Sequence, residues 1–85
     1  MEIVFTKHAN EKFEILKKYS VFITRRKVMD VLAHSDQRDY SRNPLIIAQG
    51  TLDPSHVIRI VYKVEQSNII VITFYPGRKS QYEKK

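Results

Sequence analysis

Residues 56–75 read HVIRIVYKVEQSNIIVITFY, and this stretch decides the fold. Valine, isoleucine and aromatic residues dominate two runs, 56–64 and 68–75, and this composition is typical of β-strands. The polar residues between the two runs predict a tight turn. We therefore expect the two strands to form an antiparallel hairpin.

Side chains alternate between the two sides of a strand, so each strand of the hairpin has two faces. The fully apolar sides carry Ile58, Ile60, Tyr62 and Val64 in the first strand and Ile70, Ile72 and Phe74 in the second. We expect the helices to cover these apolar sides. The uncovered side then presents Arg59, Lys63, Thr73 and Tyr75 around Val61 and Val71.

The length of the hairpin loop decides this assignment. A two-residue turn at 66–67 would place Arg59 opposite Phe74 and reverse it. An odd-length loop, such as 65–67, keeps Arg59 and Tyr75 on the same side. We therefore expect the odd-length loop.

Two short helices are predicted upstream of the hairpin. Thr6 and Thr24 are suitable N-caps, and apolar residues follow each of them at helical spacing. The expected helices cover residues 7–18 and 25–34, and a short strand is expected at 3–5. Two helices this close in sequence favour an antiparallel or crossed pair.

Two more strands are expected between the helices and the hairpin. The run 36–41 is a weak strand, and the run 45–49 is a stronger one that ends at Gly50. A turn is predicted at 53–55, and Pro76-Gly77 is expected to end the last strand. Helices first and strands afterwards indicate an α+β fold with an antiparallel meander.

Composition narrows the class of protein. The chain has 85 residues, enough for one domain, and is 42% hydrophobic and 28% charged, which is a normal globular balance. It has no cysteine, which excludes disulfide scaffolds, thiolate zinc sites and cysteine nucleophiles. No apolar run approaches the roughly 20 residues of a membrane span, and no secretion signal is recognisable. We expect a single cytoplasmic domain over residues 1–85 and no membrane association.

The charge of the chain indicates its partners. Fifteen lysines and arginines against nine acidic residues give a net charge of +6 and a pI of about 9.7. A basic domain of this size is typical of proteins that contact phosphates, although a solubility charge or an acidic protein partner remains open. The surplus lies in residues 1–34 and 56–85, so the binding face is expected at the helix starts, the last strands and a basic tail at 77–85.

Four stretches of the sequence resemble one protein family. They are Phe5-Thr6-Lys7-His8-Ala9, the segment 28–36, Arg59-Ile60-Val61-Tyr62, and Val71 to Pro76 followed by Lys79 and Tyr82. The family consists of small, largely uncharacterised prokaryotic domains allied to the RelE/ParE-like and BrnT-like toxins of type II toxin–antitoxin systems. The similarity spans nearly the whole chain.

The resemblance implies a fold and a function. The implied fold is RelE-like, in the order β-α-α-β-β-β(-β), with two N-terminal helices packed on one face of a curved antiparallel sheet. The implied function is endoribonuclease activity without a metal, with mRNA at the ribosome as one candidate substrate and an antitoxin protein as partner. Relatives include gyrase inhibitors without nuclease activity, so a non-catalytic nucleic-acid or protein-binding module on the same fold stays open.

Metal-independent RNA cleavage needs a base for the 2′-OH, an acid for the 5′-oxygen and cations for the phosphate. The candidate catalytic residues are Arg59, Tyr75, Tyr82 and His8. Arg59 is the leading candidate, because a charge inside an apolar strand is costly unless it faces water or a partner. Its guanidinium can clamp a phosphate with two hydrogen bonds. The alternative is a solvent-facing arginine that discourages aggregation.

Basic residues outside this set are candidates for RNA binding. They are Lys7, Arg25, Arg26, Lys27, Lys63, Arg78 and Lys79. The three cations at 25–27 occupy the positive end of a helix, where each is unfavourable unless a phosphate or an acidic antitoxin segment lies nearby. The alternative is a solvated basic turn. No two histidines have metal-ligand spacing, so no metal and no cofactor are expected.

Overall fold

The computed structural model describes residues 2–82. Its elements are β1 (Ile3–Phe5), α1 (Lys7–Lys18), α2 (Arg25–Ala33), β2 (Gln37–Asp39), β3 (Ile46–Asp53), β4 (His56–Glu65), β5 (Asn68–Arg78) and α3 (Lys79–Tyr82). The predicted α+β class is confirmed. In the described range, no helix has the length and apolar character needed to cross a bilayer.

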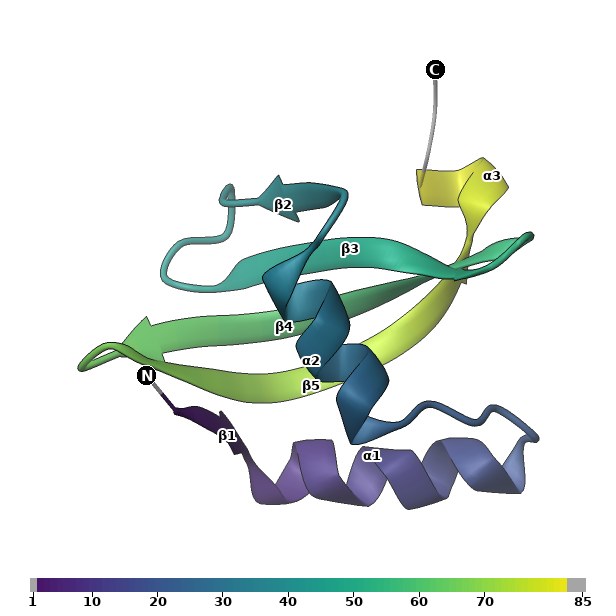
Figure 1. Ribbon diagram of the computed structural model, residues 1–85, viewed down its shortest axis with the longest axis horizontal. Helices are drawn as coiled ribbons and strands as arrows, with labels where there is room; N and C mark the ends of the chain where they lie inside the picture. The colour runs from purple at the N-terminus through teal and green to yellow at the C-terminus, as the bar shows by residue number, and fades with distance from the viewer. Residues whose placement is uncertain (1, 83–85) are drawn as a thin grey trace.

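The five strands form one mixed sheet in the order β1-β5-β4-β3-β2 (Figure 1). Strands β2 to β5 pair antiparallel, whereas β1 pairs parallel with β5. The prediction of a wholly antiparallel sheet is therefore wrong at this edge. β1 reaches β5 through the intervening helices and strands rather than through a hairpin, and a long connection of this kind permits parallel pairing.

Threonine caps fix the starts of both long helices. Thr6 Oγ1 accepts from the backbone N–H of Ala9 at 3.1 Å, and Thr24 Oγ1 accepts from that of Lys27 at 3.1 Å. Both predicted caps are confirmed, and α2 ends one residue earlier than predicted. Thr6 also donates its hydroxyl to the Ile72 carbonyl at 3.1 Å, which ties the start of α1 to β5.

The hydrophobic core joins α1, α2 and one side of the sheet, which we call the core face and which carries Ile58, Ile60 and Tyr62. α2 crosses in front of the sheet, and α1 runs along the edge formed by β1 and β5 (Figure 1). The helices contribute Ala9, Phe13, Leu16, Val28, Val31 and Leu32 to this core. The opposite side, which we call the open face, carries Arg59, Val61 and Lys63 of β4 with Thr73 and Tyr75 of β5.

In the β4–β5 hairpin, Arg59 and Tyr75 share a face as predicted, but the turn and the strand register differ from the prediction. Glu65 pairs with Asn68, so the turn has two residues and the expected odd-length loop is wrong. Gln66 and Ser67 both have positive φ, at 49° and 68°, as in the type I′ turns that suit the twist of a hairpin. Further along, Val61 pairs with Thr73 while Tyr62 pairs with Val71, which leaves Ile72 as an extra residue.

This β-bulge restores the register beyond it. Arg59 lies opposite Tyr75, so the two side chains share the open face as predicted. Between the turn and the bulge, the side chains of β5 lie on the faces opposite to those predicted, whereas those of β4 lie as predicted. Val71 is fully buried in the core, and the prediction that it lies on the uncovered side is wrong. Ile70 lies opposite Lys63 on the open face instead.

Neither glycine ends a strand, contrary to the prediction. Gly50 lies inside β3, and a Cβ placed there would come within 2.8 Å of Val31 Cγ2. Gly50 therefore permits the close approach of α2 to the sheet. Pro76 and Gly77 lie inside β5, and the predicted tail continues as the single turn α3. Residues 83–85 of the predicted tail lie outside the described range.

Candidate functional site

Arg59 is held by three side chains on the open face. It lies in the middle of β4, opposite Gln49 of β3 and Tyr75 of β5. Its Nε donates to the Tyr75 hydroxyl at 3.2 Å, and its Nη1 donates to Gln49 Oε1 at 3.0 Å. Its Cζ lies 4.3 Å from the centroid of the Tyr82 ring. We call Arg59, Gln49, Tyr75 and Tyr82 the Arg59 cluster.

Gly77 leaves the space in which the Tyr82 ring packs. A Cβ at this position would lie 2.4 Å from Tyr82 Cε2 and 2.7 Å from Cδ2, so the ring rests directly on the backbone of β5. The backbone N–H of Lys79 donates to the Ser55 carbonyl at 2.9 Å, which anchors the start of α3. α3 therefore carries Tyr82 back over Arg59.

The Arg59 cluster leaves part of the guanidinium available. Nε and one hydrogen of Nη1 are engaged, whereas Nη2 has no hydrogen-bond partner within residues 2–82. The Nη1–Nη2 end can therefore hold two oxygens of a phosphate. Tyr75 accepts from Arg59, so its own hydroxyl proton remains free to be donated.

His8 reaches the same face from the start of α1. Its Nε2 lies 3.2 Å from the Thr73 hydroxyl, and Thr73 is two residues before Tyr75 on the open face. The structure therefore brings Arg59, Tyr75 and Tyr82 into contact, whereas His8 contacts Thr73, two residues along β5 from Tyr75. Lys63 shares the open face but forms an ion pair with Glu65 at 3.0 Å.

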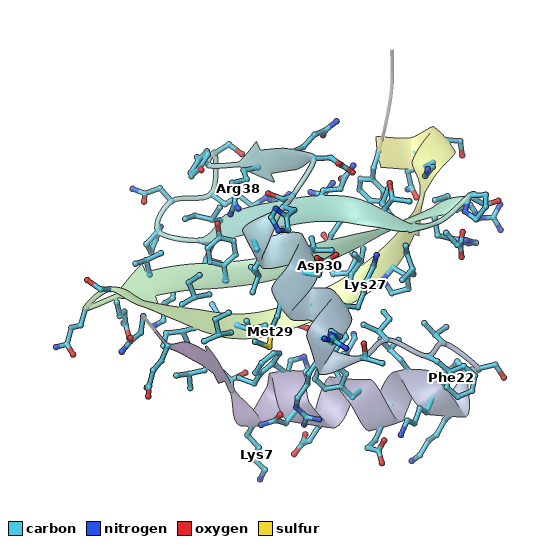
Figure 2. The ribbon with its side chains drawn as sticks, viewed as in Figure 1. Lys7, Phe22, Lys27, Met29, Asp30 and Arg38 are labelled. Atoms are coloured by element: carbon cyan, nitrogen blue, oxygen red, sulfur yellow. The ribbon has the colours of Figure 1, made fainter. Side chains whose placement is uncertain are left out.

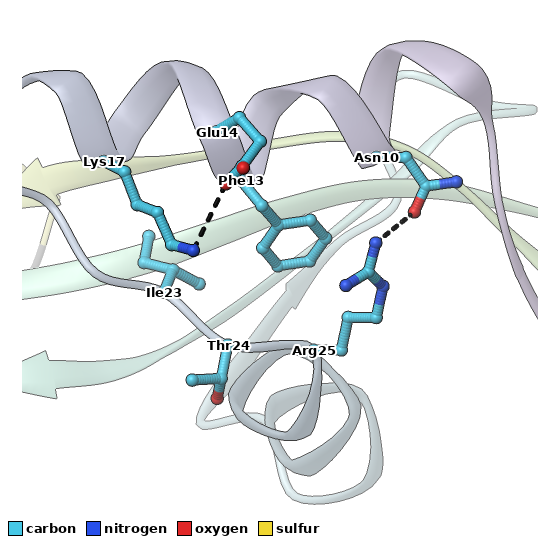
Figure 3. A pocket seen from close by; sticks show the side chains of 7 residues that line it. All are labelled: Asn10, Phe13, Glu14, Lys17, Ile23, Thr24 and Arg25. Atoms are coloured by element: carbon cyan, nitrogen blue, oxygen red, sulfur yellow. Dashed lines mark hydrogen bonds and ion pairs between the residues drawn. The ribbon is translucent and has the colours of Figure 1, made fainter.

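The basic residues at the start of α2 lie on the other side of the sheet. The guanidinium of Arg25 lies 4.6 Å from the Phe13 ring centroid and donates to Asn10 Oδ1 at 2.8 Å (Figure 3). These contacts stabilise a cation that the helix start alone disfavours. Arg25 therefore joins α2 to α1, while Arg26 is exposed and Lys27 is half-buried.

The remaining predicted RNA-binding residues are dispersed. Figure 2 shows Lys7 pointing away from the body of the molecule, and its side chain is 92% exposed. Arg78 lies opposite His56 at the end of the hairpin, on the same side as the core face. With Lys79 and two serines, Arg78 and His56 line a separate hollow of about 420 Å³.

Sequence analysis missed Gln49 and Asp39. Gln49 is the buried polar side chain of the open face, at 3% exposure. Asp39 lies on the same face, opposite Ile47. Hydrogen bonds from the Ser41 hydroxyl and backbone N–H, with smaller contributions from the charges of Arg42 and then Arg59, hold the pKa of Asp39 below its usual value. Gln49 and Thr51, two residues apart in β3, are the signal that could have marked Gln49, whereas residues 37–39 are all polar and show no alternation that would mark Asp39.

The described part of the chain brings no three His, Asp or Glu side chains together in an arrangement that could hold a metal ion. No protein-family model, no curated protein and no solved structure matches the chain. The chemistry of the open face is therefore what indicates a function.

Proposed function

We propose that this protein is a toxin-type endoribonuclease that cleaves RNA without a metal ion and is neutralised by an antitoxin protein. The Arg59 cluster carries the proposal, because it combines an oriented cation with two phenols on an uncovered sheet face. The net charge of +6 favours a polyanionic ligand. The elements up to β5 follow the order β-α-α-β-β-β-β, before the single turn α3, and this order supports the RelE-like fold that belongs to this proposal, with α1 and α2 on one face of a curved sheet.

The proposed reaction is an internal transfer. The 2′-oxygen attacks the neighbouring phosphorus, a 2′,3′-cyclic phosphate forms, and the bond from phosphorus to the 5′-oxygen breaks. The Nη1–Nη2 end of Arg59 binds the non-bridging oxygens, where negative charge increases in the transition state. His8 takes the 2′-OH proton, and the free Tyr75 hydroxyl protonates the 5′-oxygen. Tyr82 holds the guanidinium plane and offers a surface on which a base can stack.

The test is cleavage of single-stranded RNA by the purified protein in excess chelator. We expect fragments with 2′,3′-cyclic phosphate and 5′-hydroxyl ends. Arg59→Lys should lose at least about 100-fold in rate, as removal of one oriented transition-state donor does in other enzymes. Lys18→Arg is the control, because Lys18 is an exposed residue of α1, which packs on the core face, and this variant should cleave normally.

Two results would contradict the nuclease. One is intact RNA at high protein concentration. The other is cleavage of RNA whose 2′-hydroxyls are all methylated, because the proposed nucleophile is then blocked. Thermal unfolding of Arg59→Lys and of the control variant distinguishes loss of activity from loss of folding.

A non-catalytic RNA-binding module is the second candidate. The hydrogen-bond partners of Arg59 are an amide and a phenol, and neither is an imidazole or a carboxylate, the groups that most often transfer protons in enzymes; this observation favours it. Such a module would bind RNA and leave it intact. Arg59→Ala should then weaken binding and reduce the salt dependence by about one phosphate contact.

We place the antitoxin on the open face, where it would cover Arg59. Coexpression with a candidate antitoxin, followed by the RNA assay on the purified complex, tests this arrangement. A complex that still cleaves RNA, or one in which Arg59 remains accessible, would contradict it.

A further inference from the structure

A hollow of about 270 Å³ lies on the open face beside the Arg59 cluster. Its lining residues come from β2, β3 and β4 and are Gln37, Arg38, Asp39, Ile47, Gln49 and Arg59. Gln37 lies opposite Gln49, and Asp39 lies opposite Ile47, so the wall facing Arg59 is polar around one apolar residue. Small-molecule sites commonly have this form, in which a few polar groups converge on an apolar floor.

The amide of Gln49 is only half satisfied. Its Oε1 accepts from Arg59 Nη1, while its Nε2 is buried and has no hydrogen-bond partner in the described chain. Exchanging the two amide atoms would point an N–H group at a cation, so the assignment stands. Buried donors in native proteins are nearly always paired. The Nε2 group therefore requires an acceptor that a ligand in the hollow can supply.

Asp39 provides a hydrogen-bond acceptor in the same hollow, whereas Gln49 Nε2 is a donor. Its Oδ1 accepts from the Ser41 backbone N–H at 2.9 Å and from the Ser41 hydroxyl at 2.6 Å. These bonds lower the pKa of Asp39, so the carboxylate is ionised at neutral pH. Its Oδ2 has no partner within residues 2–82 and can accept N–H donors.

Arg38 does not neutralise this carboxylate. Its Nη1 donates to the Tyr62 hydroxyl and its Nη2 donates to the Leu32 carbonyl at 2.6 Å, both on the core-face side. Arg38 is labelled beside β2 in Figure 2. The hollow therefore presents the buried amide donor of Gln49 and the carboxylate acceptor of Asp39, beside the exposed amide of Gln37. Gln49 and Asp39 stand at diagonal positions of adjacent strands, whose Cα atoms lie about 7–8 Å apart in such pairs.

Guanine complements this pair among the four RNA bases. Its Watson–Crick edge has the O6 acceptor next to two neighbouring donors, N1–H and the N2 amino group. The free Oδ2 of Asp39 has two lone pairs, so this one oxygen can accept from both donors. Adenine, cytosine and uracil each offer one donor group on this edge.

We infer that the hollow is a guanine subsite for single-stranded RNA. Gln49 Nε2 donates to O6, Asp39 accepts from N1–H and the N2 amino group, and Arg59 binds the adjoining phosphate. The inference rests on the proposed function for the choice of RNA, and it adds a base preference. It also assigns Gln49 two contacts, one to Arg59 and one to the base.

The test measures binding to five-nucleotide RNAs whose 2′-hydroxyls are all methylated, so no cleavage interferes. The central base is guanine, adenine, cytosine, uracil or hypoxanthine, flanked by uracils. Guanine should bind at least about fivefold more tightly than adenine, cytosine or uracil, the lower end of what a good base contact provides. Hypoxanthine, which lacks the N2 amino group, should fall between guanine and the others. Equal affinities for all five would overturn the subsite.

Two variants separate the contacts. Gln49→Glu keeps an acceptor for Arg59 but removes the Nε2 donor, and Asp39→Asn removes the charge that accepts both base donors. Each should abolish the guanine preference. Asp30→Asn is the matched control on exposed α2 (Figure 2) and should keep the preference. A preference that survives in both Gln49→Glu and Asp39→Asn would refute the assignment.

The nuclease and the subsite can fail separately. Guanine preference with no cleavage of unmodified RNA would refute the nuclease and retain the subsite. Cleavage without any guanine preference in binding would refute the subsite and retain the nuclease. Free 5′-GMP that binds as tightly as the guanine pentanucleotide would refute RNA as the ligand.

Discussion

Gly77→Ala should displace Tyr82 from Arg59 while leaving the sheet intact. The new Cβ would lie 2.4 Å from Tyr82 Cε2, about 1 Å or more inside an ordinary carbon–carbon contact, so the ring must move. The backbone of β5 accepts alanine, because Gly77 does not have a positive φ. The change therefore acts on the ring and on its 4.3 Å contact with Arg59.

Two effects of similar size oppose each other in the stability of this variant. Loss of the cation–π contact costs about 0.5–1 kcal/mol at a partly exposed site. Replacement of a strand glycine by alanine returns about 0.4–1 kcal/mol through the unfolded chain. The free energy of unfolding should change by less than about 1 kcal/mol, whereas RNA cleavage should fall as far as it does in Tyr82→Ala.

A double-mutant cycle with Tyr82→Ala provides the decisive assay. Without the ring, the alanine at position 77 meets no obstacle, so the second substitution should add no further loss of cleavage. Denaturation by urea gives the free energies of unfolding. The NMR chemical shift of the Arg59 side chain shows whether the Tyr82 ring lies over it. Additive losses in the cycle, or an unchanged Arg59 shift in Gly77→Ala, would refute the reasoning.

The other predictions concern packing and pH. Gly50→Ala should destabilise the protein by about 1–3 kcal/mol in urea denaturation, because its Cβ would lie 2.8 Å from Val31 Cγ2, and Val31→Ala should restore part of the loss. Equal stability of Gly50→Ala and the unmodified protein would show that α2 can shift freely. The Asp53 side chain accepts hydrogen bonds from His56 and from the Ser55 backbone, which lower its pKa below 3.8. The resulting stabilisation should be fully present above the unfolded-state pKa of Asp53 and should decline as the pH falls through its lower folded-state pKa. Asp53→Asn should remove this part of the acid dependence. Acid unfolding curves of the same shape for Asp53→Asn and the unmodified protein would contradict this role of Asp53.

Local signals in the sequence were sufficient to predict the helix starts and the hairpin. Thr6 and Thr24 cap the helices because their hydroxyls satisfy free N–H groups within three residues, and this interaction is encoded locally. The position of Arg59 was predicted for the same reason, since a charge in an apolar strand must face away from the core.

The bulge at Ile72 was outside the reach of sequence analysis. Residues 69–72 are apolar without interruption, so alternation gives no information about which side chains are buried. The two-residue turn and the bulge each change the register by one, and together they return Arg59 and Tyr75 to one face. The difference shows in Val71, which is buried in the core, and in Ile70, which lies on the open face.

Two residues of the candidate site, Gln49 and Tyr82, take their positions from contacts between segments that are distant in the sequence. Gln49 is buried because Arg59 and Gln37 flank it on neighbouring strands, and strand order is not encoded by any one strand. Tyr82 meets Arg59 because Gly77 leaves room for its ring. The parallel pairing of β1 likewise depends on tertiary structure, since a three-residue strand has too few side chains to specify a partner.

One NMR titration tests most directly whether the open face binds RNA. Methylated single-stranded RNA is added to the labelled protein, and the side-chain Nε–H signals of Arg59 and Arg25 are followed together. The account predicts a saturable shift of the Arg59 signal and a constant Arg25 signal, because Arg25 lies across the sheet against Phe13. A shift of Arg25 with an unchanged Arg59 signal would contradict it.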